Sequence, residues 1–251
     1  MTTNDIHTPR DIHADAIDLA ALHPHPATEA EDPLLITDAE ARNLFADIPW
    51  RRLAVVGDSI AEGIGDPRPG YASVPWADRL ARWLLAAHPE SDYLNTGRMG
   101  ATLAEIRAEQ LARVADFHPD LIQVTGGGND LFRRGTRMET VERELDELCT
   151  ELAATGARLS LFTLADAFTG KLRPLRTVFA EYADVVRRVA DRHDAILTEF
   201  WEHPARLRSD WLSADHIHLT MAGQAVVATE LARAFATASR AAQRRSTATG
   251  A

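Results

Sequence analysis

The chain has very few of the residues that build disulfides, metal clusters or membrane spans. Cys149 is the only cysteine among its 251 residues, which excludes an internal disulfide and a thiolate metal cluster. No long hydrophobic run occurs, and the polar, acidic amino terminus lacks the apolar segment of a signal peptide. The sequence therefore predicts a cytoplasmic protein without a membrane-spanning segment.

Lysine is nearly absent, and acidic residues outnumber basic ones. Lys171 is the only lysine, the arginines form no stripe, and the formal net charge is -10 at pH 7. Nucleic acids and anionic membrane surfaces both require clustered cationic side chains on the protein. We therefore expect neither of them as a partner, and we expect a small-molecule substrate instead.

Apolar patterning divides the chain into an extension, one domain and a tail. Residues 1 to about 32 have little apolar periodicity and are expected to be disordered or loosely attached. They form part of an N-terminal extension over 1–48, which also holds a short predicted helix at about 38–47. The main domain is expected over 49–242, and a frayed polar tail over 243–251.

Five short apolar segments alternate with segments of helical periodicity. The first begins at Leu53 and is rich in β-branched residues, as in a strand that is buried on both faces. The other strands are expected at 93–95, 120–125, 158–164 and 195–197. This alternation predicts an α/β fold with a five-stranded parallel sheet, helices on both faces and the strand order 2-1-3-4-5.

Capping-box patterns predict where several helices begin. Thr37, Thr102 and Thr136 each stand three residues before a glutamate, which is the spacing of reciprocal hydrogen bonds at a helix N-terminus. The helix after Thr37 is expected to pack on the outside of the domain. A last amphipathic helix is expected after Thr220.

Candidate functional residues follow the first three strands. Ser59 ends the first strand, Gly100 comes after the second, and Asn129 comes after the third. In the order 2-1-3-4-5 the first strand lies between the other two, so the three carboxyl ends meet at one crevice. Ser59 is therefore a candidate nucleophile rather than an ordinary turn residue.

A serine nucleophile needs a base that takes its proton, and two histidines near the carboxyl end compete for that role. Asp215 precedes His218 by three residues, so its carboxylate can accept a hydrogen bond from Nδ1 and leave Nε2 facing the serine. This spacing favours His218 as base and Asp215 as its orienting partner. His216 is expected to be a partly exposed loop residue.

Acyl transfer also requires hydrogen-bond donors that face the developing oxyanion. The candidates are the backbone N–H groups of Ser59 and Gly100 and the side-chain amide of Asn129, and a glycine at position 100 lets a substrate approach the backbone closely. The glycine run 126–128 lacks the lysine and hydroxyl residue of a phosphate-binding P-loop. We therefore do not expect a nucleotide site.

Four sequence blocks together resemble the GDSL-like, or SGNH, hydrolases. They are Gly57-Asp58-Ser59-Ile60, Gly100 with its flanks, Gly127 to Asp130, and Asp215-x-x-His218, in that family's order over residues 53 to about 238. The resemblance implies a three-layer α/β/α flavodoxin-like fold and a Ser59–His218–Asp215 triad. It also implies an oxyanion hole from Ser59, Gly100 and Asn129, with esterase, thioesterase or acyltransferase activity and neither metal nor other cofactor. Ile60 replaces the family's usual leucine, and His216 stands where a small residue is common.

The ordinary α/β-hydrolase fold is the nearest rival, because Gly57-x-Ser59 begins like a nucleophile elbow. It is disfavoured because position 61 is alanine and because Asp215 and His218 are only three residues apart. The preferred function is hydrolysis of a small carboxylic ester or thioester through an acyl-serine intermediate. Acyl transfer to a metabolite hydroxyl by the same residues and a catalytically silent binding domain are the alternatives.

The residues that would bind the substrate are weakly encoded. Apolar side chains on or near the same loops are candidates for the pocket lining, namely Tyr71, Trp76, Met99, Leu131, Phe132 and Phe168. The loop 62–75 is polar and contains several glycines, so it has few apolar residues with which to close over a site. We expect an open, wet crevice that favours hydrolysis over transfer.

Overall fold

The computed structural model describes residues 26–249, and its centre is a five-stranded sheet in the order β2-β1-β3-β4-β5. Every strand pairing in this sheet is parallel, which confirms the predicted α/β class and strand order. The strands are β1 (Arg52–Val56), β2 (Asp92–Asn95), β3 (Leu121–Val124), β4 (Arg158–Phe162) and β5 (Ile196–Thr198).

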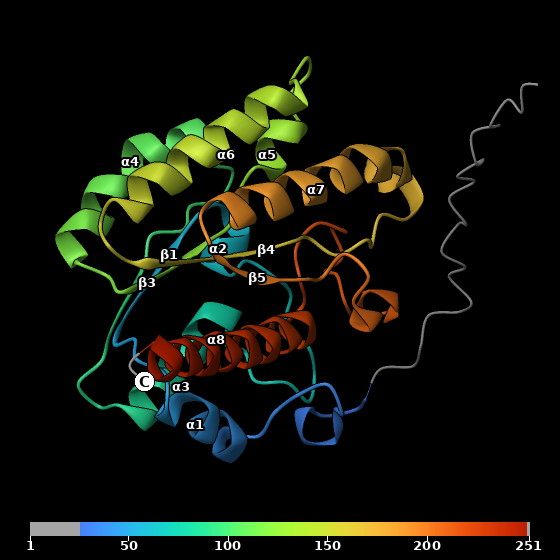
Figure 1. Ribbon diagram of the computed structural model, residues 1–251. Helices are drawn as coiled ribbons and strands as arrows, with labels where there is room; N and C mark the ends of the chain where they lie inside the picture. Colours follow the sequence, from blue (N-terminus) through green and yellow to red (C-terminus); the bar gives the residue numbers. More distant parts are fainter. Residues whose placement is uncertain (1–25, 250–251) are drawn as a thin grey trace, which may run out of the picture.

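Helices cover both faces of the sheet and complete a three-layer α/β/α architecture (Figure 1). One face carries α4 (Leu103–Phe117), α6 (Met138–Ala153) and α7 (Arg176–Arg192), and the other carries α1 (Asp38–Ala46), α3 (Trp76–Ala87) and α8 (Met221–Thr249). Alternate side chains of β1 enter the two apolar layers. Leu53 and Val55 pack in the layer with α3 and α8, whereas Ala54 and Val56 pack in the layer with α4 and α6.

Short helices connect the main elements. They are η2 (Glu29–Glu31), α2 (Ser59–Glu62), α5 (Gly128–Leu131), η3 (Gly170–Leu175) and η4 (Pro204–Leu207). The capping boxes at Thr37 and Thr102 are confirmed, since each hydroxyl accepts from the backbone N–H of the glutamate three residues on. The capping box predicted at Thr136 is wrong: α6 begins at Met138 without a side-chain cap. The Thr136 hydroxyl instead donates to the carbonyl of Asp130 at 2.7 Å.

The segment before β1 is packed into the domain from residue 26 onward. Helix α1 occupies the region of the predicted helix and packs against α3 and α8, with Phe45 fully buried in the shared core. Asp32 is only 5% exposed and forms an ion pair with Arg208. The expected loose attachment as far as residue 32 is therefore wrong for Asp32, because a buried carboxylate is fixed by its partner. Residues 1–25 lie outside the described part of the chain.

The last helix is longer than the sequence predicts. Helix α8 continues to Thr249, although the polar composition from Gln243 onward favours a frayed tail. The Gln243 side chain donates a hydrogen bond to the carbonyl of Asp47 at 3.2 Å, which fastens this part of the helix to the end of α1. Within residues 26–249, neither α8 nor any other helix is long and apolar enough to cross a membrane.

Replacing Phe45 by alanine is expected to lower the free energy of unfolding by about 3–5 kcal/mol, because removal of a fully buried ring leaves a cavity in the core. Leu44→Ala, at the half-buried neighbouring position, is the matched control and is expected to cost clearly less. Urea denaturation of the two variants measures both effects. Equal small losses would contradict the assignment of α1 to the core.

Candidate active site

Ser59 lies at the turn from β1 into α2, where it is 7% exposed. Asp58 caps this short helix, and its Oδ1 accepts a hydrogen bond from the backbone N–H of Ile60 at 3.0 Å. Gly57 makes the turn possible, because its φ is +151° and a Cβ there would lie 2.0 Å from the carbonyl oxygen of Thr125. The sequence Gly-Asp-Ser thus presents the hydroxyl at the carboxyl end of a central strand.

A continuous chain of hydrogen bonds connects Ser59, His218 and Asp215. Ser59 Oγ lies 2.8 Å from Nε2 of His218, and Nδ1 of His218 lies 2.6 Å from Oδ2 of Asp215. When Nδ1 carries the proton, the imidazole donates to the carboxylate and Nε2 accepts from the serine hydroxyl. The structure brings together the three residues that the sequence analysis selected as a triad.

Backbone hydrogen bonds fix the orientation of Asp215. Its Oδ1 accepts from the N–H groups of Ile217 and His218, at 2.9 and 3.0 Å. Partial burial acts to raise the pKa of Asp215, but the hydrogen bonds from His218 and Ile217 outweigh it, and the pKa lies below its ordinary value. Asp215 is therefore a carboxylate at neutral pH, which is the form that accepts from the imidazole.

Asp215 and His218 lie near the tip of a hairpin formed by residues 210–220. An antiparallel bridge between Leu212 and Leu219 pairs its two arms. The carbonyl of His218 also accepts a hydrogen bond of 2.7 Å from the opposite arm. The hairpin therefore holds the imidazole and its carboxylate partner on one small, internally bonded unit.

The loop 62–75 packs against this hairpin rather than standing free. The backbone N–H of Asp66 donates to Ser213 Oγ at 2.8 Å, and its Oδ2 accepts from the N–H of Ala214 at 2.9 Å. The carbonyl of Asp66 accepts from the N–H of Met221 at 2.9 Å. These bonds tie the loop that follows Ser59 directly to the segment that carries His218.

The two other candidate donors lie on neighbouring loops. Gly100 has a φ of +78°, and no heavy atom lies within 4 Å of the position that a Cβ would take. Asn129, in α5, donates from Nδ2 to the carbonyl of Ala101 at 3.0 Å, which orients its amide and connects the two loops. In the described part of the chain, the backbone N–H groups of Ser59 and Gly100 have no hydrogen-bond acceptor. Both amides are therefore available to a ligand.

Gln110 is a structural residue of the site that the sequence analysis missed. It is 2% exposed, and its amide donates to the carbonyl of Gly57 at 2.8 Å and accepts from the Gly57 N–H at 2.9 Å. Its Oε1 also accepts from Thr96 Oγ1 at 2.9 Å. One side chain thus joins the turn before Ser59 to the loop after β2. The available signal is its position, four residues from both Ile106 and Val114 on the buried face of α4.

Asp58 is a buried carboxyl group adjacent to Ser59. Burial raises the pKa of Asp58 to about 6, although hydrogen bonds from the Ile60 N–H and the Thr125 hydroxyl act in the opposite direction. Between pH 3.8, the ordinary pKa of an aspartate, and a pH of about 6 the folded protein holds a proton that the unfolded chain has released. The contribution of Asp58 to stability therefore decreases as the pH rises through that range.

An apolar cavity of about 110 Å³ extends from Ser59 into the domain. Asn129, His216 and Ile217 line it together with Ser59, and its aromatic lining includes Phe132, Phe168 and Phe179. The rings of Phe168 and Phe179 lie 4.5 Å apart between their centroids, and those of Phe132 and Phe179 lie 5.7 Å apart. Phe132 and Phe168 thus occupy the place that the sequence analysis gave them.

The other predicted pocket residues lie elsewhere. Trp76 is fully buried at the start of α3, where its Nε1 donates to the carbonyl of Ile60 at 2.7 Å. Tyr71 is buried in a polar cluster, with its hydroxyl bonded to Asp32. Met99 is 53% exposed beside Gly100, and it does not line the cavity. Leu131 packs against the buried core on the α4 and α6 side of the sheet instead.

Several lining residues were not predicted as such, among them Leu172, Phe179, Trp211 and Ile217. Phe179 follows the apolar periodicity of α7, which is the same pattern that a core residue shows. Periodicity separates buried from exposed positions, but it does not separate cavity walls from filled core.

Comparisons with known proteins identify the family and the fold. The model of the GDSL-like lipase/acylhydrolase family matches residues 55–226. LAE5, an alpha/beta hydrolase enzyme from the metagenome of Lake Arreo in Spain, is 26% identical, with a TM-score of 0.62 over 74% of this chain and 94% of that chain. Axe2, an acetylxylan esterase from Geobacillus stearothermophilus, is 22% identical, with the same coverage and TM-score. A search of curated protein sequences gave no match.

The family match covers more than half of the chain, from the middle of β1 into α8. It includes Ser59, Gly100, Asn129, Asp215 and His218, and the neighbouring structures share the layered fold. This chain belongs to the GDSL-like lipase/acylhydrolase family and is an esterase.

Proposed function

We propose that this esterase cleaves a carboxylic ester through an acyl-serine intermediate on Ser59. The observation that carries the proposal is the 2.8 Å contact between Ser59 Oγ and His218 Nε2. His218 takes the hydroxyl proton as Oγ attacks the carbonyl carbon, and Asp215 stabilises the imidazolium that forms. The imidazolium then protonates the leaving alcohol, and the tetrahedral intermediate collapses to the acyl-enzyme.

Hydrolysis of the acyl-enzyme uses the same groups. His218 takes a proton from water, the resulting hydroxide attacks the acyl carbon, and Ser59 leaves with the proton returned to Oγ. In both steps the backbone N–H groups of Ser59 and Gly100 and the Asn129 amide are proposed to stabilise the oxyanion. A donor of this kind is worth about 3–4 kcal/mol in comparable sites.

Acyl transfer to an alcohol is the alternative outcome, and thioester cleavage would follow the same steps. Transfer dominates only when a site holds an alcohol in line and limits the access of water. Asp215 and Gly100 are exposed, and the loop 62–75 is fastened to the 210–220 hairpin instead of being free to close. These observations favour water as the acceptor, and therefore hydrolysis.

We assign the apolar cavity to the acyl chain of the substrate. It is continuous with Ser59 and Asn129, and its lining beyond them is dominated by aliphatic and aromatic side chains. An acetyl group, as carried by the substrate of Axe2, places a single methyl group in this space. Acyl groups of several carbons fill more of it and bury more apolar surface.

Ser59→Ala is expected to reduce kcat/KM for p-nitrophenyl butyrate by several powers of ten, since the nucleophile and its base act as one unit. A fluorophosphonate probe followed by peptide mass spectrometry is expected to place the adduct on Ser59 in the natural protein. Ser91→Ala, at a buried serine just before β2, is the control and should label normally. An adduct on another residue would contradict the assignment.

The two neighbouring histidines are expected to differ sharply. His218→Ala removes the general base and should lower kcat by about three to four powers of ten. His216 lines the cavity without bonding to Ser59, so His216→Ala should lower kcat less than about tenfold. Steady-state kinetics at neutral pH measures kcat for both variants. A larger loss of kcat in His216→Ala than in His218→Ala would contradict the assignment of His218 as the base that Asp215 orients.

Lengthening the acyl chain from acetyl to hexanoyl is expected to raise kcat/KM up to about fourfold per methylene, since burial contributes about 0.8 kcal/mol for each CH₂. Phe168→Ala should weaken this dependence while leaving acetyl ester turnover less affected, because Phe168 lines the cavity. Leu85→Ala, at an exposed position on α3, is the control. A decline beyond acetyl in the natural protein would indicate an acetyl esterase.

A further inference from the structure

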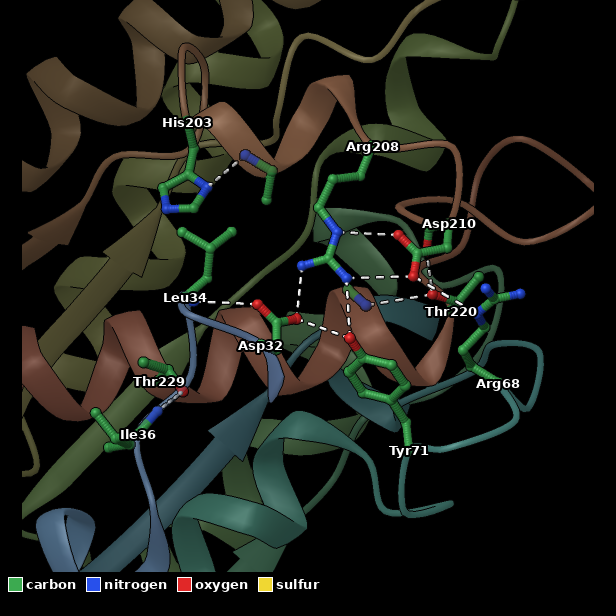
Figure 2. A network of polar contacts seen from close by, with 12 residues as sticks. Asp32, Leu34, Ile36, Arg68, Tyr71, His203, Arg208, Asp210, Thr220 and Thr229 are labelled. Carbon is green, nitrogen blue, oxygen red and sulfur yellow. Dashed lines mark hydrogen bonds and ion pairs between the residues drawn. The ribbon is translucent and has the colours of Figure 1, made fainter. Parts of the chain in front are cut away.

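A buried cluster of charged groups lies at the base of the 210–220 hairpin, where three distant segments of the chain meet (Figure 2). Arg208 is at its centre, with Nη1 lying 2.6 Å from Oδ2 of Asp32. Its Nε and Nη2 donate to the two carboxylate oxygens of Asp210 at 3.0 and 3.2 Å. The Tyr71 hydroxyl donates to Asp32 at 2.8 Å and accepts from Arg208 at 3.1 Å.

The charges in this Arg208 cluster balance. Arg68 Nε lies 3.5 Å from Oδ2 of Asp210, so two guanidinium groups face two carboxylates. Asp32, Arg208 and Asp210 are each at most 7% exposed. A buried charge without its partner is strongly unfavourable, whereas a buried ion pair adds little stability compared with apolar residues. The planar guanidinium fork of Arg208 does, however, fix the positions of the two carboxylates relative to each other.

The cluster is bonded directly to the base of the hairpin. Asp210 begins the hairpin, and its carbonyl accepts a hydrogen bond from the hydroxyl of Thr220, which ends it. The N–H of Thr220 donates to the carbonyl of Trp211 at 3.1 Å, so the two arms are joined at this end. Whatever fixes Asp210 therefore fixes the hairpin from which Asp215 and His218 project.

Asp32 comes from outside the stretch that matches the family, which begins at residue 55. Its Oδ1 accepts from the N–H of Leu34 at 3.0 Å, and shortly after it the N–H of Ile36 donates to Thr229 Oγ1 on α8 at 3.4 Å. The carboxylate is thus held by its own segment, and that segment is in turn bonded to the C-terminal helix. A segment that precedes the family domain supplies one of the two acids of the cluster.

We propose that Asp32 is a positioning residue of the esterase: through Arg208 and Asp210 it sets where the hairpin holds the His218 imidazole relative to Ser59. This inference rests on the proposed function, because the position of the imidazole is expected to set the rate of the proton transfers that His218 performs. A displacement of about 1 Å in such a contact can cost about 10²-fold in rate. Asp32 touches no substrate in this scheme. It acts through Arg208, to which it is also joined by the Tyr71 hydroxyl, on Asp210 at the start of the hairpin.

The test compares Asp32→Asn with Asp194→Asn. The first keeps the side-chain shape and removes the charge that faces Arg208. The second removes the charge of an exposed aspartate that pairs with Arg158, at a position whose φ of +48° suits asparagine. Fluorophosphonate labelling of Ser59 counts the active sites, and kcat is expressed per labelled site. A merely structural role would reduce the number of labelled sites without changing the rate of each.

Asp32→Asn is expected to label Ser59 to the full stoichiometry but more slowly, with kcat per labelled site about 10- to 100-fold lower and KM changed less than about twofold. Asp194→Asn should match the natural protein. Unchanged kcat per labelled site in Asp32→Asn, or an equal loss in Asp194→Asn, would overturn the proposal. Absence of labelling on Ser59 in the natural protein would instead contradict the proposed function.

Tyr71→Phe keeps the inference testable if Asp32→Asn does not fold. This variant removes only the hydroxyl that joins Asp32 and Arg208, and the charges of the cluster remain. It is expected to lower kcat per labelled site about three- to tenfold while circular dichroism remains unchanged. A kcat per labelled site within twofold of the natural protein would overturn the proposal.

Discussion

The hydrogen bond between Ser59 and His218 joins residues that are 159 positions apart in the chain. Its 2.8 Å length requires two independently built units to meet within a fraction of an ångström, the β1 turn and the 210–220 hairpin. Gln110 anchors the turn, Asp66 anchors the side of the hairpin, and the Arg208 cluster anchors its base. Each anchor consists of hydrogen bonds between backbone or buried polar groups, which are directional in a way that apolar packing is not.

The sheet explains why these anchors are within reach of one another. In the order β2-β1-β3-β4-β5, the carboxyl ends of β1, β2 and β3 lie side by side at the point where the chain changes direction along the sheet. The loops after these strands carry Ser59, Gly100 and Asn129. The Gln110 side chain joins the loops after β1 and β2, and the Asn129 side chain joins the loops after β3 and β2.

Much of this could be predicted from the sequence because it depends on local patterns and general topology. Buried strands are short apolar runs, helices show their own periodicity, and parallel sheets follow a small set of orders. The pairing of Asp215 with His218 is equally local, since it spans three residues within one hairpin. The strands, the helices and the Asp215–His218 pair each depend on residues close together in the sequence, and the order of the strands then brings the site residues together.

The features that could not be predicted depend on contacts between distant segments. Asp32 and Arg208 are 176 residues apart, and no spacing rule connects them. Tyr71 and Trp76 have the composition of pocket residues, yet one bonds within the buried cluster and the other packs in the core. The capping box at Thr136 failed for a different, local reason, because its hydroxyl bonds to the nearby carbonyl of Asp130 instead.

Competition between water and an added alcohol offers the most direct measurement of the proposed acyl-enzyme. Butyrate esters with p-nitrophenyl, phenyl and methyl leaving groups would be cleaved by the natural protein at one fixed concentration of glycerol, and butyric acid and glyceryl butyrate would be quantified. A common acyl-serine intermediate predicts the same ratio of acid to glyceryl ester for every leaving group, with the acid in excess. A ratio that changes with the leaving group would contradict an acyl-enzyme on Ser59.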